Sequence, residues 1–320
     1  MAPSLASQAK PAAVLWLAGF LQAARLHRVV SFCASSRPLS VRIAQCFLLN
    51  GFIFLGSLLT LKSVVIPMLS WILPEECSQL QGQHLCGHTV AVATYSFLRS
   101  VLIQIFYVFW FYPLYIFSFI LSTLWYNDIA KHALDVVKSK SLDATKALDA
   151  HTISESTERP EGFDGVAIGI GEQVYSILLL TIFFIEVSVI GYVPYFGKAI
   201  NFLLLSLMYA YYCFEYKWNF FAVSLNERLD FFESNWAFFA GFGSPCVLPI
   251  FFFSPLASYG VMAILYPLFV LTAAGTQAER VIDQLKPSHG GKLQRIPVFF
   301  VAKRLTTQVL QLFPEVQKEQ

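Results

Sequence analysis

Two cysteines and two histidines in one short stretch are the side chains with the clearest capacity for chemistry. Cys77 and Cys86 flank His84, and His88 follows. Four such side chains can form a tetrahedral metal site, whereas two thiols alone form a disulfide in an oxidising compartment. The stretch lies between two apolar runs, on the side assigned below to a lumen. We therefore expect a disulfide between Cys77 and Cys86, with free thiols or a metal site as the alternatives.

A single carboxylate interrupts one of the apolar runs. Glu186 lies about 18 Å into the run that begins near Val174, at 1.5 Å per residue. A charged group at that depth is costly, and ionisable residues inside apolar segments are functional candidates. We expect a protonated Glu186 that is hydrogen-bonded to a neighbouring Tyr or Ser, and the alternative is an ion or proton pathway.

Signatures of catalysis are absent from the sequence. Gly169-Ile170-Gly171 lacks the third glycine and the preceding strand of a dinucleotide site. The sequence has no phosphate loop, zincin motif, Cys-x-x-Cys pair or Gly-x-Ser-x-Gly elbow. We therefore expect no enzyme, no catalytic residue and no cofactor. The remaining cysteines are expected to be reduced, packed thiols: Cys33, Cys46, Cys213 and Cys246.

These residues are embedded in membrane sequence. The hydrophobic fraction is 56%, only 13% of residues are charged, and the stretch from Ser234 to Ala278 contains no Asp, Glu, Lys or Arg. A spanning helix needs about 20 apolar residues. The chain is thus predicted to be an all-α polytopic membrane bundle of about six segments, some of them candidates for half-penetrating hairpins. The segments are Ile43–Leu61, Ser100–Leu124, Val174–Tyr192, Ala199–Phe214, Trp236–Phe253 and Ala257–Ala274.

The distribution of basic residues predicts the orientation. If all six segments cross, all but three of the 22 Lys and Arg residues fall on one side, the exceptions being Lys62, Arg99 and Lys198. Short cytosolic loops collect Lys and Arg, so both termini are expected in the cytosol. No basic stripe with interleaved aromatics indicates nucleic-acid binding. The expected parts are a cytosolic arm (1–42) with an interfacial amphipathic helix, a membrane domain (43–274) with a cytosolic loop (126–173), and a cytosolic tail (275–320) with an amphipathic helix.

The cytosolic loop is expected to begin with a separate short helix. Asn127 or Asp128 can cap its N-terminus, and apolar residues recur at helical spacing as far as Leu148. The polar, acidic stretch from 149 to 165 is predicted to be a linker.

A cluster of aromatic, charged and small residues surrounds the junction before the fifth segment. Trp218 and Trp236 bracket this junction as interfacial aromatics, and the glycines permit close helix packing. We favour a structural re-entry motif over a partner-binding or substrate site. The cluster comprises Cys213, Glu215, Tyr216, Trp218, Arg228, Trp236, Gly241, Gly243 and Pro245.

With the block Trp125-Tyr126-Asn127-Asp128-Ile129-Ala130, this cluster resembles the etoposide-induced protein 2.4 family. These are endoplasmic-reticulum membrane proteins linked in animals to apoptosis and basal autophagy. The sequence is more distantly similar to the bacterial CysZ sulfate permeases. The resemblance runs from Arg42 to Leu312 and is strongest from 209 to 275. The loop with Cys77 and Cys86 and the acidic linker depart from the animal pattern, which indicates a non-animal homolog.

The resemblance implies a multi-pass endoplasmic-reticulum protein that regulates or scaffolds autophagy and cell death. Its expected partners are the lipid bilayer and other membrane or autophagy proteins, with a homo-oligomer as a further option. The distant resemblance implies the alternative, an anion permease for sulfate-like ions. An anion pathway requires basic side chains or helix N-termini near the middle of the membrane. Glu186 has the wrong sign, although breaks between Gly241 and Pro255 can supply N–H groups.

Overall fold

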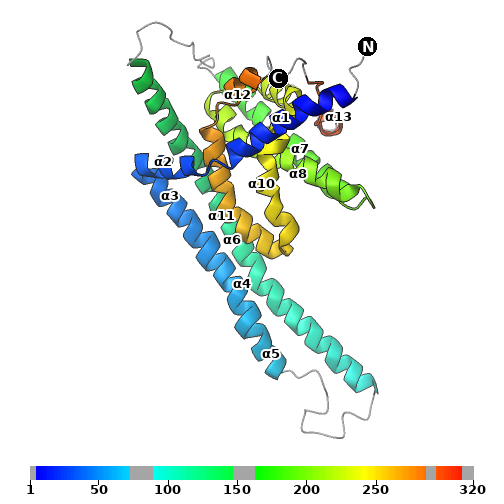
Figure 1. Cartoon of the computed structure of the whole chain (residues 1–320). Helices are drawn as coiled ribbons and strands as arrows, with labels where there is room; N and C mark the ends of the chain where they lie inside the picture. The colour runs from blue at the N-terminus through cyan, green and yellow to red at the C-terminus, as the bar shows by residue number, and fades with distance from the viewer. Residues whose placement is uncertain (1–4, 73–88, 147–162, 286–292, 312–320) are drawn as a thin grey trace.

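A computed structural model describes residues 5–72, 89–146, 163–285 and 293–311, and within those ranges every regular element is a helix (Figure 1). The elements are α1 (Leu5–Ala23), α2 (His27–Ser35), α3 (Arg37–Phe47), η1 (Leu48–Leu55), α4 (Gly56–Thr60), η2 (Leu61–Val65), α5 (Ile66–Ile72), α6 (Thr89–Lys146), α7 (Phe163–Ile190), α8 (Gly197–Phe220), α9 (Leu225–Ser234), α10 (Trp236–Phe252), α11 (Pro255–Ala274), α12 (Ala278–Leu285) and α13 (Phe300–Gln311). The predicted all-α membrane fold is confirmed.

The first membrane segment lies in one continuous rod, α3 to α5, whose middle contains the π-helical turns η1 and η2. Ser36 caps the rod by accepting a hydrogen bond from the Leu39 N–H, and Pro38 occupies the first turn, where no N–H is needed. From Arg42 to Lys62 the rod rises about 30 Å, the thickness of a hydrocarbon core. These two charged residues therefore mark the two edges of the apolar part.

The second segment lies in α6, a helix of 58 residues that runs beside the rod (Figure 1). The helix cap predicted at Asn127 or Asp128 is wrong, because α6 continues without interruption through both residues. Asn127 bonds back to the Thr123 carbonyl (3.4 Å), as a mid-helix residue does. Beyond it, the apolar residues Ile129, Ala133 and Leu134 pack into a buried cluster with α2, α3 and α11. Packing of this face overrides the local capping signal.

All six predicted segments coincide with helices to within two residues at their ends, although they differ in how well they suit a full crossing. Among the described residues, three helices are long and apolar enough to span a membrane: Arg37–Ile72, Ala93–Ser139 and Ala257–Ala274. A fourth candidate is the pair α9 and α10, which is bent by 89°. The third segment forms a shorter apolar helix, Val174–Ile190, and the fourth lies in α8, which is not among these candidates. A count of six full crossings therefore stays a prediction.

Helix α10 lies in the centre of the bundle, and nearly all of its first three turns is buried. Glycines bring it into backbone contact with two different helices. A Cβ on Gly241 would lie 1.8 Å from the Trp16 carbonyl oxygen of α1, and one on Gly243 would lie 1.7 Å from the Ser206 carbonyl oxygen of α8. Gly19 of α1 meets the Phe238 carbonyl in the same way. The amphipathic N-terminal stretch therefore packs directly onto the membrane hairpin, and leaves Leu17 and Leu21 exposed.

Helices α10 and α11 form a hairpin that turns at Phe253 and Ser254. Ser258 donates to the carbonyls of Pro249 (3.3 Å) and Phe253 (3.1 Å), so it bonds the start of α11 to the end of α10. Ala257 packs on Leu58 and Leu61 of the rod. Since Leu61 adjoins Lys62, the turn of the hairpin reaches the far edge of the apolar region.

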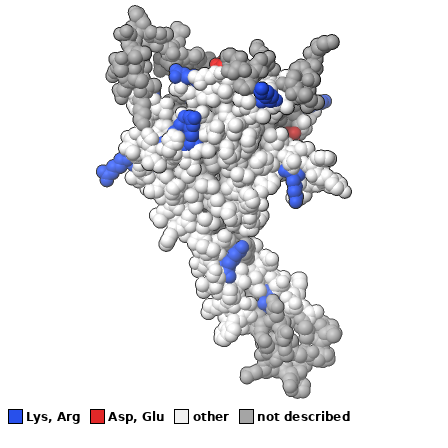
Figure 2. Space-filling view, in the orientation of Figure 1, with Lys and Arg blue, Asp and Glu red and all other residues white. Residues whose placement is uncertain are grey.

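The charged side chains gather at the opposite end of the molecule. Lys and Arg side chains are conspicuous around the end that carries α1, α2 and α13, and are sparse along the middle (Figure 2). The first and last described helices thus lie at the same end (Figure 1). The termini themselves, residues 1–4 and 312–320, lie outside the described part.

The glycine contacts predict a position-specific response to one added methyl group. Gly243→Ala should lower the yield of folded protein, because its Cβ would overlap the α8 backbone, and overpacking of this kind costs about 1–3 kcal/mol or more. Gly56→Ala is the matched control, since nothing lies within 4 Å of a Cβ there. Size-exclusion of detergent-extracted protein measures both. Equal monodisperse yields would show that α8 and α10 are not in backbone contact.

Candidate functional site

A buried carboxylate lies at the bend between α9 and α10. Glu233 is only 1% exposed, yet it is surrounded by donors. Arg295 donates to its Oε2 from Nε (3.1 Å) and again from Nη2, while the Phe299 N–H donates to Oε1 (3.1 Å). Lys303 Nζ lies 3.9 Å from Oε1. The Glu233 anchor, as we call this set of contacts, fixes the segment before α13 against the bend.

The anchor extends to the backbone and to a second acid. The Ile296 N–H donates to the Glu233 carbonyl (3.3 Å), which adds a main-chain link to the side-chain contacts. Asp230, one turn earlier in α9, accepts from Arg295 Nη2 (2.7 Å) but is exposed. The hydrogen bonds that Arg295 donates to Glu233, together with the charges of both acids, raise the pKa of Arg295 above its ordinary value. The guanidinium therefore stays charged at any physiological pH.

Two cations bind the C-terminal end of α11. Arg28 of α2 donates to the Gly275 carbonyl (3.2 Å) and to Thr276 Oγ1 (3.1 Å), and Lys217 of α8 donates to the Thr276 carbonyl (2.8 Å). Carbonyls at a helix C-terminus lack intrahelical partners and carry the negative end of the helix dipole. Burial lowers the pKa of Arg28, with a smaller contribution from Arg25. Helices from three parts of the chain thus meet at this helix end.

The cluster predicted from the sequence is distributed over several contacts. Glu215 accepts from Ser176 Oγ (3.1 Å), which links α8 to α7. Arg228 is buried and donates to the Val223 carbonyl (2.7 Å) and to Asn219. Trp218 is buried against Phe214 and Phe239, inside the protein rather than on its surface. The other cluster members have these positions: Cys213 is buried in the core, Tyr216 is partly buried against it, and Trp236 Nε1 donates to the Gln294 carbonyl (3.3 Å).

The block in α6 lies apart from that cluster. Trp125 packs at the edge of the buried group shared by α2, α3, α6 and α11. Asp128 pairs with Arg42 of α3 at 3.3 Å, and both side chains are partly exposed. Pro245 lies in α10 beyond the two glycines that contact α1 and α8. The structure therefore does not bring the residues of the two sequence blocks together at one centre.

Glu186 lies in α7 with its Oε2 buried and without a hydrogen-bond partner among the described residues. No hydrogen bond from Glu186 to a neighbouring Tyr or Ser is seen among the described residues. Cys77, Cys86, His84 and His88 lie outside the described residues. Within the described ranges no group of His, Cys, Asp or Glu is arranged to hold a metal ion.

A polar centre that the sequence analysis missed lies between the rod, α6 and α11. Pro267 has no N–H, so the Ala263 carbonyl four residues earlier loses its helical donor. Asn50 Nδ2 (3.3 Å) and Tyr126 OH (3.0 Å) donate to this carbonyl instead, with the Cys46 thiol at 3.7 Å. Asn50 is itself held by two buried serines of α6, Ser118 and Ser122. We call these contacts the Ala263 centre.

Signals for these residues do exist in the sequence. A lone Asn in an apolar run indicates a buried polar side chain that needs a partner. A Pro inside a predicted membrane helix likewise indicates a backbone carbonyl that needs one. Glu233 is likewise the last acid before the uncharged stretch. Asn50 and Pro267, which identifies the Ala263 carbonyl, are therefore both visible in the sequence, but nothing there shows that they meet. For Glu233, the partner Arg295 lies far away in sequence and has no feature that identifies it.

Comparisons with known proteins agree on the relatives of this chain. The family model described as sulfate transporter CysZ/etoposide-induced protein 2.4 matches residues 25–267. A protein EI24 homolog from Arabidopsis thaliana is 56% identical over 315 residues, which is 96% of this chain and 97% of that protein. A protein EI24 homolog from Dictyostelium discoideum is 27% identical over 94% of this chain and 84% of its own length. No solved structure matches significantly.

Glu233 and Asp230 both pair with Arg295, and the Glu233 anchor predicts that replacing each acid by its amide has a different effect on stability. Glu233→Gln should destabilise the protein by about 1.5–3 kcal/mol, because it removes charge-assisted hydrogen bonds at a buried carboxylate. Asp230→Asn should cost about 1 kcal/mol or less, because that pair is exposed. Thermal unfolding in detergent, followed by tryptophan fluorescence, measures both. Similar midpoints for the two variants would mean that Glu233 is not a buried anchor.

The Ala263 centre predicts a coupling between residues on different helices. Asn50→Leu should cost about 1 kcal/mol, the scale of hydrogen bonds between membrane helices. In a Pro267→Ala background the cost should be smaller, because the restored N–H of residue 267 supplies the Ala263 carbonyl from within α11. A double-mutant cycle on unfolding free energies measures the coupling. Additive effects would show that Asn50 does not replace the missing donor.

Proposed function

The chain belongs to the family of sulfate transporter CysZ and etoposide-induced protein 2.4, and from this premise we propose that it is an endoplasmic-reticulum regulator or scaffold in autophagy and cell-death control. In this proposal it is a multi-pass membrane protein with both termini in the cytosol, and it has no enzymatic activity. Its partners are other membrane or autophagy proteins.

The observation that supports the proposal is that the helices at the basic end of the molecule are held in place by side-chain and backbone contacts. The Glu233 anchor holds the segment before α13, and the two cations on the end of α11 hold α2 and α8. Backbone contacts at Gly19 and Gly241 hold α1. A scaffold needs a surface of constant shape, and a surface made of helices locked onto a membrane core meets that need.

The orientation proposed here rests on charge and on geometry. Lys and Arg gather at the end where α1 and α13 lie, as cytosolic ends of membrane proteins do (Figure 2). Because both helices are at this end, the segments between them return the chain to the side from which it started (Figure 1).

Anion permeation is the second candidate, and the broken hairpin favours it. The 89° bend before α10 and the prolines Pro245 and Pro249 are irregularities of the kind that transporters use at substrate sites. The basic residues with described partners, such as Lys217, Arg228 and Arg295, nevertheless lie near the charged end. Among the described residues, Glu186 is a carboxyl group with a buried oxygen that has no hydrogen-bond partner, and it would repel an anion if ionised.

A paired experiment tests the proposal against this alternative. Cells whose copy of the gene is deleted should show reduced autophagic flux, measured by turnover of a lipidated autophagosome marker, and the wild-type chain should restore it. A fluorescent fusion should coincide with an endoplasmic-reticulum marker. The purified chain in proteoliposomes should take up no sulfate above empty vesicles. Normal autophagic flux in the deleted cells, together with saturable sulfate uptake by the proteoliposomes, would contradict the scaffold proposal and support the permease.

A further inference from the structure

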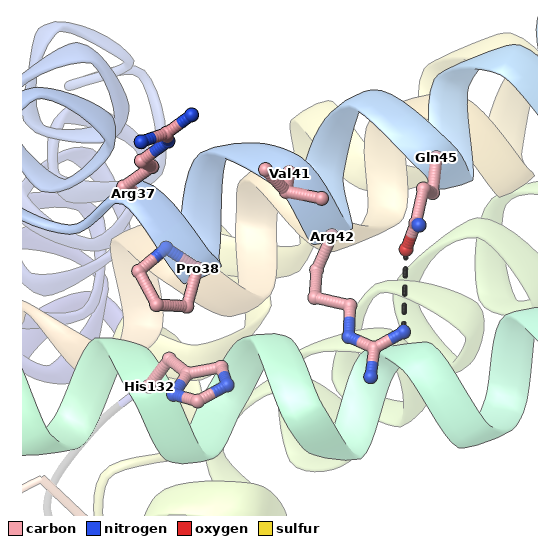
Figure 3. Close-up of a pocket in the computed structure, with 6 residues that line it drawn as sticks. All are labelled: Arg37, Pro38, Val41, Arg42, Gln45 and His132. Atoms are coloured by element: carbon pink, nitrogen blue, oxygen red, sulfur yellow. Dashed lines mark hydrogen bonds between the residues drawn. The ribbon is translucent and has the colours of Figure 1, made fainter.

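An open pocket of about 460 Å³ lies between α3 and α6 at the charged edge of the membrane region. Figure 3 shows Arg42 extending from α3 toward α6, with His132 of α6 facing Pro38. The pocket lies beside the first turns of the rod, at the level where its apolar stretch begins. Its lining residues are Arg37, Pro38, Val41, Arg42, Gln45 and His132.

The pocket combines basic and polar side chains with the apolar Pro38 and Val41, and the rod beyond it is apolar. Arg42 donates to Gln45 (3.2 Å) and pairs with Asp128 (3.3 Å), but side-chain exposures of 39% and 46% keep that ion pair weak. Val41, Leu48 and Phe52 follow at helical spacing on the exposed face of the rod. A ligand of matching shape has an anionic head and an apolar tail.

We propose that this pocket binds the headgroup of an anionic phospholipid that carries a phosphomonoester, with its acyl chains along Val41, Leu48 and Phe52. A guanidinium binds phosphate oxygens through paired N–H donors, and basic pockets between membrane helices on the cytosolic side suit such headgroups. The volume exceeds the need of one phosphate and lies in the range of pockets for ligands of about 300–1,000 Å³. Gln45 and His132 supply further polar groups for a phosphorylated inositol ring.

Asp128 has a defined part in this proposal. Its carboxylate occupies one side of the Arg42 guanidinium, so it competes with a bound phosphate for the same donors. Lipid binding therefore exchanges one anion for another at Arg42. This exchange predicts opposite effects for the two members of one ion pair, which a purely structural role of the pair does not.

The test is native mass spectrometry of the full chain in detergent with dioctanoyl phosphatidylinositol 4-phosphate. Arg42→Gln should weaken binding about tenfold, the equivalent of one charge-assisted contact, whereas Asp128→Asn should tighten it. Arg25→Gln removes the same charge from an exposed site at the same end of the molecule and should change binding by less than about twofold. The melting temperature of each variant shows whether it is folded.

The comparison ligands distinguish the sources of phosphate. Dioctanoyl phosphatidylinositol, which has only the phosphodiester, should bind more weakly, and excess inorganic sulfate or phosphate should not displace the lipid. Displacement by the free ions would assign the pocket to a small anion and overturn the proposal. Weaker binding by Asp128→Asn, or equal binding of both lipids, would overturn it as well.

Discussion

A carbonyl group inside a bilayer that loses its helical N–H has no water to replace it, and this constraint determines where the helices of the protein meet. Pro267 creates such a carbonyl at Ala263. The donors that satisfy it come from the rod and from α6, so the defect in α11 is the point where three membrane elements join. At the turn of the hairpin, Ser258 donates to the carbonyls of Pro249 and Phe253, in addition to the Phe253 N–H that Pro249 accepts. The break in α11 thus specifies contacts instead of weakening the bundle.

The charged end follows the corresponding rule for helix termini and buried charge. The C-terminal carbonyls of α11 are satisfied by Arg28 and Lys217, and the carboxylate of Glu233 is satisfied by Arg295 and a backbone N–H. In each case the donor comes from an element far away in the chain. Local helix ends therefore determine how the amphipathic segments fold back onto the membrane core.

The sequence predicts the helices well because hydrophobicity and length decide where a chain enters lipid. The six apolar runs all coincide with helical structure, and α11 begins at Pro255, a residue suited to the first turn of a helix. The separate helix predicted from Asn127 was wrong, because a capping side chain can also bond back within a continuing helix. The partners of the site residues were beyond prediction for a different reason. Gly241 and Gly243 indicate close helix contacts, but only the folded bundle shows that Gly241 contacts α1 and Gly243 contacts α8.

These contacts bear on which motions the bundle permits. Alternating access requires one group of helices to move against another about a central site. In this protein α10 is held on one side by α1 and on another by α8, with glycine backbones in direct contact. If α10 slid past either helix, a larger side chain would come to lie where only the Cα hydrogen of a glycine fits. The pair formed by the rod and α6 is joined within itself by the Arg42–Asp128 ion pair and by the Asn50–Ser122 hydrogen bond, and it is linked to α11 through the Ala263 carbonyl. A movement of this pair against the hairpin of α10 and α11 would have to break the hydrogen bonds that Asn50 and Tyr126 donate to the Ala263 carbonyl.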